Sequence, residues 1–490
     1  MARMQRQHPR PDIDIDAELG LETGSLAPLR PIYRSRLLHF PIFRFFKDTL
    51  LSTYWRAHGL KGELRSFYRK RLSRYSAFRT LRNWVFSVHD RYRREWIRLS
   101  LRYRGDTFAL VQIDTYAQEH HLSRQTIEPE TLIEIPSPRF IGFTPDEYAG
   151  LKTVRVPSPR LALTEVPQAN VIGGTDFVLV GDEAIHSSFY NPAREVCPAE
   201  TFGEAGLDPD QRLIRTRVPR GRRRVGPAAT IIGQCAGNYA HWLTEILPKL
   251  VVLDSSTADK DLPLLIDGWV HPNLHEALQV VNHNKRPLIQ VERWEMVASE
   301  RVVHVAPVAY IPAEYREYVT SGKILKTGPD EFPFSRTALL GLRDVALKAA
   351  APGKKKYRKL YLRRANNGNT RTAVNDHEAE ALARRYGFET IEPGGLSFRE
   401  QLSIFSDAEL VVGQIGAALS NVIFARQQCK VIVMSPYYED ASYYFWSNLF
   451  GMLKHELYYV VGPQIGEGHP FHKNFKIDIG ALEKAFRQFA

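Results

Sequence analysis

The 490-residue sequence is poor in cysteine and has no long apolar run. Its three cysteines, Cys197, Cys235 and Cys429, lie far apart and form no CxxC pair. This spacing argues against a structural zinc site and a disulfide scaffold, and it favours a reducing compartment. No run approaches the ~18 apolar residues of a membrane-spanning helix, and residues 1–16 lack the apolar core of a secretory signal. We therefore expect a cytoplasmic protein, either soluble or peripheral on the inner face of the cytoplasmic membrane.

The composition excludes collagen and wholesale disorder, because 44% of the residues are hydrophobic and 24% are charged. The net charge of +12 is concentrated in residues 34–104, where 19 Lys and Arg face four acidic residues, so the rest of the chain sums to −3. The same segment contains many aromatic residues, which predicts helices with mixed basic and aromatic faces. Two interpretations stay open: binding to an anionic membrane surface, or packing against the catalytic domains or a second subunit of a homo-oligomer. No nucleic-acid partner is expected, because the remaining residues are net acidic.

The chain is long enough for two or three domains of ~150 residues. Residues 12–16, with three aspartates, are interpreted as solvated charges in a tail, so no metal site is predicted. The expected divisions are a flexible tail over 1–30, a basic aromatic helical segment over 31–104, two Rossmann-like domains over 105–335 and 336–440, and a helical segment over 441–490 that returns to the first domain.

The clearest pattern lies between Lys359 and Met434, where short hydrophobic strands alternate with helices. Strands are predicted over 360–363, 388–391, 409–412 and 430–434, and helices over 375–386, 397–405 and from about residue 416. Capping-box spacing at Asn375 and Ser397 marks two of the helix starts. Repeated β-α units with short links predict an α/β fold with a parallel sheet, whose ligands bind at the carboxyl ends of the strands.

The first candidate cluster is a predicted helix that carries Asn238, His241 and Glu245 on one face. An imidazole and a carboxylate one turn apart can share a proton, as general-base catalysis requires. The helix start next to Gly237 also offers free N–H groups to an anion. The alternative is a surface ion pair, or a buried histidine that hydrogen-bonds its neighbour.

The second cluster combines arginines at a strand end with the start of the next helix. Arg364 and Arg371 suit a diphosphate, because guanidinium groups pair bidentately with phosphate oxygens. Asn375 opens the helix beside them. The alternative is that Asn375 and Glu378 only cap the helix and that the arginines are solvated.

The third cluster is a hydrophobic strand that runs into small residues and then into a helix. Gly413, Gly416 and Ala417 allow a ligand to approach the backbone, and Asn421 follows in the helix. Taken alone this signal is weak, because strand-to-helix turns of small residues are common.

The three motifs together resemble glycosyltransferase family 61. They read Asn-Tyr-x-His-Trp-Leu-Thr-Glu-x-Leu-Pro from residue 238, then Leu-Tyr-x-x-Arg and Arg-x-x-x-Asn-x-x-Glu from residues 360 and 371, then Gly-x-x-Gly-Ala-x-Leu-x-Asn from residue 413. The family includes bacterial capsule and lipopolysaccharide enzymes, and the resemblance spans roughly residues 150–440. One departure is Ile415, which stands where many members have histidine.

The resemblance implies a GT-B fold of two Rossmann-like domains facing across a cleft, here with an N-terminal basic α-helical extension. It also implies inverting, metal-independent transfer from a nucleotide-sugar donor to a glycan or lipid-linked acceptor in cell-surface polysaccharide synthesis, with no cofactor. His241 or Glu245 would deprotonate the acceptor. Donor contacts would come from Asn238, Arg364, Arg371, Asn375, Gly413, Gly416, Ala417 and Asn421. The alternative is a non-catalytic, membrane-associated scaffold of the same fold.

Overall fold

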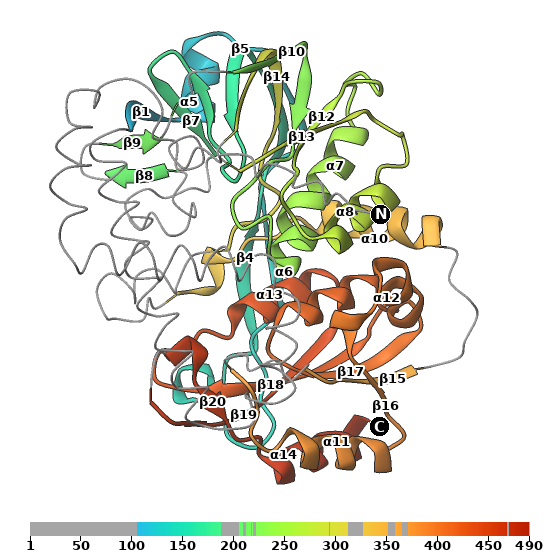
Figure 1. Cartoon of the computed structure of the whole chain (residues 1–490). Helices are drawn as coiled ribbons and strands as arrows, with labels where there is room; N and C mark the ends of the chain where they lie inside the picture. Colours follow the sequence, from blue (N-terminus) through green and yellow to red (C-terminus); the bar gives the residue numbers. More distant parts are fainter. Residues whose placement is uncertain are drawn as a thin grey trace, which may run out of the picture. The chain divides into compact units, whose positions relative to one another are not determined.

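The computed structural model describes residues 105–187, 205–208, 212–216, 218, 222–293, 295–311, 327–350, 358–364, 371–467 and 470–489. All of them belong to the second of two compact units, residues 85–490. The predicted tail and the basic aromatic segment, residues 1–30 and 31–104, lie outside the described residues. The described part is an α/β structure with two large sheets (Figure 1).

The first sheet contains 12 of the described strands. Its main path is β13 (Leu288–Val291), β12 (Leu264–Asp267), β11 (Ala228–Thr230), β14 (Met296–Val305), β5 (Leu161–Ile172), β6 (Val178–Val180), β7 (Glu183–His186), β1 (Asp106–Gln112), β9 (Leu213–Thr216) and β8 (Ala205–Asp208), while β10 (Arg223–Val225) pairs with β14 and β2 (Arg124–Glu128) with β5.

Only one part of this sheet has the β-α pattern predicted for residues 105–335. Strands β11, β12, β13 and β14 run parallel, and their connections contain α6 (Tyr239–His241), η4 (Trp242–Ile246), α7 (Leu247–Asp254) and α8 (Pro272–Val281). Strands β5, β6 and β7 are antiparallel instead. The two residues between β6 and β7 are too few for a parallel crossover, which needs a dozen or more. The parallel β-α pattern predicted for residues 105–335 is therefore observed only from residue 228 onward.

The second sheet confirms the predicted alternation between residues 359 and 434. It contains β16 (Glu389–Ile391), β15 (Arg358–Leu362), β17 (Ala408–Gln414), β18 (Lys430–Tyr437), β19 (Glu456–Ile465) and β20 (Asn474–Phe475), of which the first five are parallel. Its helices and 3-10 turns are α11 (Asp376–Arg385), η6 (Pro393–Gly395), α12 (Phe398–Phe405), η7 (Ala417–Phe424), α13 (Tyr444–Met452), η8 (Pro470–His472) and α14 (Ile479–Phe489).

Side chains on each strand of the second sheet alternate between two buried layers. Leu360 and Leu362 belong to one hydrophobic core, whereas Tyr361 between them belongs to another. The second layer includes residues of α11 and α14, and these two helices lie together below the sheet in Figure 1. Burial on both faces explains why these strands are continuous hydrophobic runs.

The segment over 441–490, predicted to be helical, also contains two strands. The ten-residue β19 runs parallel to β18 and lengthens the sheet. Helix α13 contacts β3 (Thr131–Pro136), which forms a hairpin with β4 (Thr153–Ser158). Residues 139–141 of the same hairpin segment also bridge to Tyr459 of β19, because Ile141 N donates to Tyr459 O and Tyr459 N donates to Arg139 O, at 2.9 and 2.7 Å. The remaining described elements are α5 (Ile113–Glu119), η3 (Asp146–Tyr148), η5 (Pro329–Glu331) and α10 (Arg336–Ala350).

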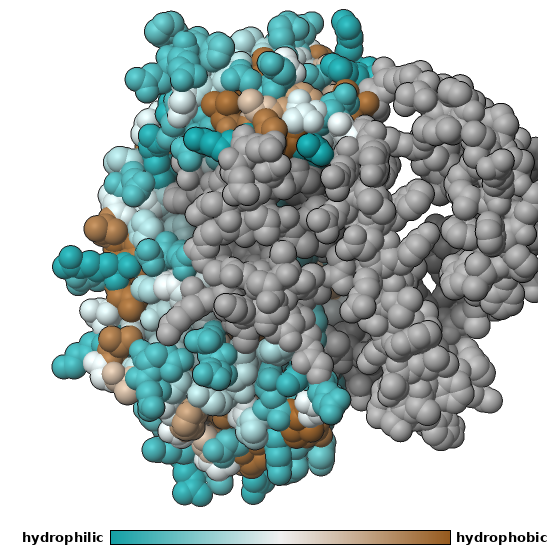
Figure 2. All heavy atoms as spheres, turned by 90° about the vertical axis from the view of Figure 1, so that its left-hand side faces the viewer, coloured by the Kyte–Doolittle hydropathy of each residue, from teal (hydrophilic) through white to brown (hydrophobic). Residues whose placement is uncertain are grey.

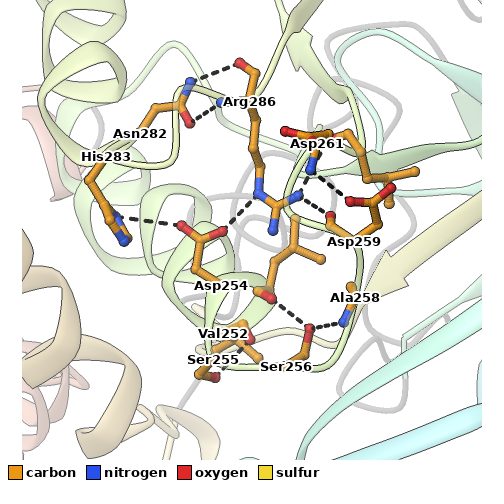
Figure 3. A network of polar contacts seen from close by, with 12 residues as sticks. Val252, Asp254, Ser255, Ser256, Ala258, Asp259, Asp261, Asn282, His283 and Arg286 are labelled. Carbon is orange, nitrogen blue, oxygen red and sulfur yellow. Dashed lines mark hydrogen bonds and ion pairs between the residues drawn. The ribbon is translucent and has the colours of Figure 1, made fainter.

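A buried arginine fixes the end of α7, the helix that continues from the first motif (Figure 3). The Arg286 side chain is fully buried, and its Nε donates to Asp254 Oδ1 at 2.7 Å. Its Nη1 donates to the carbonyl oxygen of Asp259 at 2.6 Å. Asn282 forms hydrogen bonds with both the backbone N–H and the backbone carbonyl of Arg286. These contacts hold the last residue of α7 against the loop that follows it.

On the face shown in Figure 2, hydrophobic side chains occur in several small groups among hydrophilic ones. Within the part of the chain that the structure describes, no helix has the length and apolar character to cross a membrane.

Candidate active site

The first motif forms a helix with a wide turn in its middle. Asn238 is its N-cap, and the Asn238 side chain accepts a hydrogen bond from Ala240 N at 3.0 Å. Residues Trp242–Ile246 are π-helical, and the α-helix resumes at Leu247. Single π-turns within α-helices are frequent at functional sites. The observed contact of Asn238 is the capping one, so this geometry gives no support to its predicted contact with the donor.

His241 and Glu245 form the predicted pair. The His241 Nδ1 atom lies 2.9 Å from Glu245 Oε2, and both side chains are about one-fifth exposed. If Glu245 is ionised, Nδ1 must carry the shared proton. The other ring nitrogen, Nε2, makes no hydrogen bond with the described residues. The pair can therefore present one unprotonated nitrogen to a substrate.

Tyr239, between Asn238 and His241, connects the first motif to the second sheet. Its hydroxyl donates to Asn421 Oδ1 at 2.7 Å, and Gln401 Oε1, 3.2 Å away, is a second, weaker acceptor for the same hydrogen. Asn421 Nδ2 donates in turn to Gln401 Oε1 at 2.7 Å. Burial raises the pKa of Tyr239 far above its usual value, so it stays a neutral donor. The sequence interpretation missed this role, because the partners are far apart along the chain.

Asn421 is fully buried, and its two amide hydrogens are used by Gln401 and by the Ala418 carbonyl. This leaves it no surface with which to contact a donor. The predicted helix near residue 416 is present as the 3-10 helix η7, and Gly416 precedes it. Gly413 is buried in β17, and a Cβ there would lie 3.1 Å from Leu362 Cβ. Close packing of β17 against β15 therefore explains the glycine at 413.

The predicted capping box at Asn375 is wrong. Its side chain does not cap α11 but bonds to the backbone of Ile477, with Nδ2 donating to O at 3.1 Å and Oδ1 accepting from N at 2.8 Å. A distant partner has thus replaced the local one, and the Asn375 side chain is buried. The second predicted box is confirmed, because Ser397 accepts from Glu400 N and Glu400 accepts from Ser397 N.

Arg364 and Arg371 lie together at the carboxyl end of the second sheet. Arg364 Nη1 donates to the carbonyl oxygen of Arg371 at 3.2 Å and approaches that of Ile415 at 3.5 Å. Burial lowers the pKa of both guanidinium groups, and the neighbouring Arg371 adds to the effect on Arg364. Two cations held this close favour an anion between or beside them.

A hollow with an empty volume of about 280 Å³ adjoins Arg371. The buried Nε of Arg371 has no hydrogen-bond partner, and an unpaired buried donor of this kind is costly unless a ligand or water satisfies it. The hollow follows the ends of β17 and β18. Its lining consists of Arg371, Ile415, Ser435, Pro436, Tyr438, Ala441, Ser442, Tyr443 and Phe471.

The two clusters meet through η7. Helix α6, which carries Tyr239 and His241, contacts η7, and a Cβ at Gly416 would lie 3.8 Å from Arg364 Nη1. Ala417, the first residue of η7, is half-buried at the same place. The structure thus brings His241, Glu245, Gly416, Ala417, Arg364 and Arg371 to neighbouring elements. The described contacts of Asn238, Asn375, Gly413 and Asn421 are with other residues of the chain.

No group of three or more His, Cys, Asp or Glu among the residues described could hold a metal ion. Near the end of α7, Asp259 and Asp261 form a local turn, in which Asp261 N donates to Asp259 Oδ1.

Comparison with known proteins supports one family for residues 239–432. Residues 239–432 match the family model described as Glycosyltransferase 61, and every predicted site residue except Asn238 lies within that range. None of the curated proteins compared with the sequence matches it. A mutant flavo di-iron protein from Thermotoga maritima is 11% identical, with 75% of this chain and 98% of that chain covered, but the TM-score of 0.19 is too low to support an argument about the fold.

Proposed function

We propose that the chain is an inverting glycosyltransferase with the GT-B arrangement. It would move a sugar from a nucleotide sugar to a glycan or lipid-linked acceptor in the synthesis of a cell-surface polysaccharide. One observation carries the proposal, a set of contacts between the His241–Glu245 pair and the two arginines at the end of the second sheet. His241 pairs with Glu245, and α6, which carries His241, contacts η7. Arg364 approaches the carbonyl oxygen of Ile415 just before η7. A proton acceptor and an anion clamp are the two groups that sugar transfer from a diphosphate requires.

His241 is the proposed base, and Glu245 orients it. The acceptor hydroxyl oxygen bonds to the anomeric carbon, and its proton passes to His241 Nε2. The bond between that carbon and the diphosphate oxygen breaks, and its electron pair leaves with the diphosphate. A single displacement of this kind inverts the anomeric configuration. Glu245 stabilises the imidazolium that forms, as the carboxylate does in a catalytic triad.

Arg364 and Arg371 are proposed to hold the departing diphosphate. The free Nε of Arg371 and the adjoining hollow support this role. Positive charge that is already in place stabilises the negative charge that develops on the leaving group, so the transfer would proceed without a bound metal. The aromatic and hydroxyl groups beyond the arginines would then contact the rest of the nucleotide. The first sheet would supply the acceptor side and the second sheet the donor side.

A second function, nucleotide-sugar binding without turnover, is favoured by Ile415 alone. The family position often holds histidine, but here an apolar side chain lines the donor hollow, and Ile cannot shuttle a proton. Incubation of the protein with labelled UDP-, GDP- and CMP-sugars and candidate acceptors separates the two. Release of free nucleotide that depends on acceptor supports the enzyme, whereas binding without release supports the scaffold.

The basic aromatic segment, residues 34–104, is proposed to bring the enzyme to an anionic membrane surface. Its charge of +15 and its interleaved aromatic rings support this role. The full-length protein should sediment with vesicles that contain anionic lipid and be released at high salt. Failure to sediment at low salt would favour the other interpretation, in which the segment packs within the fold or between subunits.

A further inference from the structure

A second hollow, separate from the donor hollow, lies at the ends of the parallel strands β11 and β14. Its volume of about 260 Å³ includes space that is open to solvent, so only the edge of a ligand can enter it. Thr230 ends β11, and His304 and Val305 end β14. The chain passes from β11 to β12 and β13 on one side, whereas β14 lies on the other side of β11. Ligands of open α/β sheets bind at such carboxyl ends, where the strand order reverses.

Lys249 lines this hollow, and its buried position without a partner among the described residues needs an explanation. Its side chain lies two turns beyond His241 in the helix of the first motif, and the residue is only 7% exposed. It forms no hydrogen bond and no ion pair with any residue that the structure describes. A buried ammonium group without an oxygen partner is costly. A partner from outside the chain is therefore expected at its Nζ.

The nearby acid that could have paired with Lys249 is already occupied. A Cβ at Gly233 would lie 3.8 Å from Lys249 Nζ, and Gly233 N donates to Asp267 Oδ2 at 3.2 Å. Asp267 also accepts from Gly174 N at 2.7 Å and from Trp269 Nε1 at 3.0 Å. Three N–H donors thus hold this carboxylate, and burial raises its pKa to about 6.

Asp176 supplies an acceptor on the wall of the same hollow. One of its carboxylate oxygens accepts from Gln234 Nε2 at 3.0 Å, and the other makes no hydrogen bond with the described residues. The Thr230 hydroxyl oxygen already accepts from Ile232 N, so its hydrogen is free to point elsewhere. Buried His304 stays neutral, because burial and Lys249 lower its pKa to about 3. The wall therefore presents one cationic donor beside one anionic acceptor.

We propose that this hollow binds two adjacent hydroxyl groups at one edge of a neutral acceptor sugar, with Lys249 donating to their oxygens and Asp176 accepting from their hydrogens. A hydroxyl group is both donor and acceptor, so a pair of them satisfies both side chains at once. The carboxylate of an acidic sugar would satisfy Lys249 but would be repelled by Asp176. Burial lowers the pKa of Lys249, and the negative charges of Asp176, Glu245 and Asp267 oppose that shift. The inference rests on the proposed function, because it treats the first sheet as the acceptor side.

Binding of methyl glycosides to the full-length protein tests this inference. The probes are the methyl glycosides of glucose, galactose, mannose and xylose. Each of the three hexosides is compared with the methyl glycoside of the corresponding uronic acid. Affinity is measured by ligand-observed NMR titration. At least one neutral glycoside should bind about tenfold more tightly than its uronate. Lys249→Met and Asp176→Asn should each weaken that binding by roughly tenfold to 100-fold, since each removes a charged hydrogen-bonding group.

Two exposed positions provide matched controls, Lys260→Met and Asp182→Asn, which should leave glycoside binding unchanged. Asp176→Asn keeps Lys249 in place and tests the site even if Lys249→Met fails to fold. Absence of glycoside binding, equal binding by the variants, or preference for a uronate would overturn the inference. The affinities for UDP and GDP, measured in parallel, should not change in either variant. If the unmodified protein binds neither UDP nor GDP, the proposed function is contradicted instead of this inference.

Discussion

The hydroxyl of Tyr239 lies 2.7 Å from the side-chain oxygen of Asn421, although the two residues are 182 positions apart in the sequence. Tyr239 belongs to the first motif and Asn421 to the third, and Gln401 of α12 completes the network. The motifs are therefore joined by direct contact. The same contact places α6, with His241, against η7.

Replacing Tyr239 with Phe should lower the free energy of unfolding by about 1–3 kcal/mol, because the buried oxygen of Asn421 loses its donor. Urea denaturation measures the effect. Tyr386→Phe is the matched control, since that hydroxyl contacts Glu483 nearer the surface, and its cost should stay within about 0.5 kcal/mol. Equal losses in the two variants would show that the network does not stabilise the junction.

Arg286→Met should destabilise the protein by roughly 3–5 kcal/mol, because Asp254 keeps a charge in a buried site that has lost its cation. The comparison is Arg301→Met, whose exposed partner is Glu165 and whose loss should cost at most about 1 kcal/mol. Thermal and urea unfolding check both values. A small effect at Arg286 would mean that water replaces it readily.

Glu245→Gln and His241→Ala should each reduce turnover by about 10²–10⁴, the range of general-base catalysis, while donor affinity changes little. Steady-state assays of nucleotide release provide the first measurement and calorimetry the second. His377→Ala, at an exposed position on α11, is the control. Near-normal turnover in both folded variants would place the base elsewhere.

Arg364→Ala and Arg371→Ala should each weaken nucleoside diphosphate binding by roughly 1.5–3 kcal/mol, the contribution of a charged hydrogen bond. Arg363→Ala offers a close control, because this neighbouring arginine is exposed and pairs with Glu392. Isothermal titration with UDP and GDP measures all three. If the control loses as much affinity as the other two, general charge attraction explains the binding.

The buried imidazole of His455 makes stability depend on pH. Burial lowers its pKa from 6.5 to about 4, so the unfolded chain binds the proton more readily and stability falls as pH drops below about 6.5. Between pH 7.5 and 5 this group alone should cost about 2 kcal/mol. His455 Nδ1 accepts from Cys429 N at 3.1 Å, and His455→Gln keeps an acceptor but removes the titration. The variant should therefore lose less stability than the unmodified protein over that interval, and parallel losses would refute the assignment.

The sequence pattern predicted the second sheet well between residues 359 and 434, because the strands and helices there have local signatures. Leu360 and Leu362 face one layer and Tyr361 the other, and Ser397 caps its own helix through Glu400. Prediction was wrong where a distant partner decided the outcome. Asn375 has cap spacing but bonds to Ile477, 102 positions away. Strand β19 was missed for another reason, because its aromatic and β-branched residues favour a strand and were not taken into account.

The candidate site was also predicted only where the sequence carries a local signal. The i,i+4 spacing of His241 and Glu245 identified the pair, and strand-end position identified Arg364 and Arg371. Lys249 and Asp176 were missed because neither spacing nor residue type distinguishes them from surface charges. Asp267 is the last residue of β12, and an acidic residue at a strand end is the kind of signal that identified the arginines.

The bridge between the hairpin segment and Tyr459 bears on how the two sheets can move. Arg139 and Ile141, between β3 and β4, share backbone hydrogen bonds with Tyr459 of β19, so a rotation of the second sheet would carry this hairpin with it. Bending would then fall on two-residue links, 129–130 and 159–160, and each contains a proline, Pro129 and Pro159. Proline fixes φ and limits the dihedral change that a hinge can absorb. These links should act as a short, stiff strap that allows only small rotations between the sheets while substrates bind and leave.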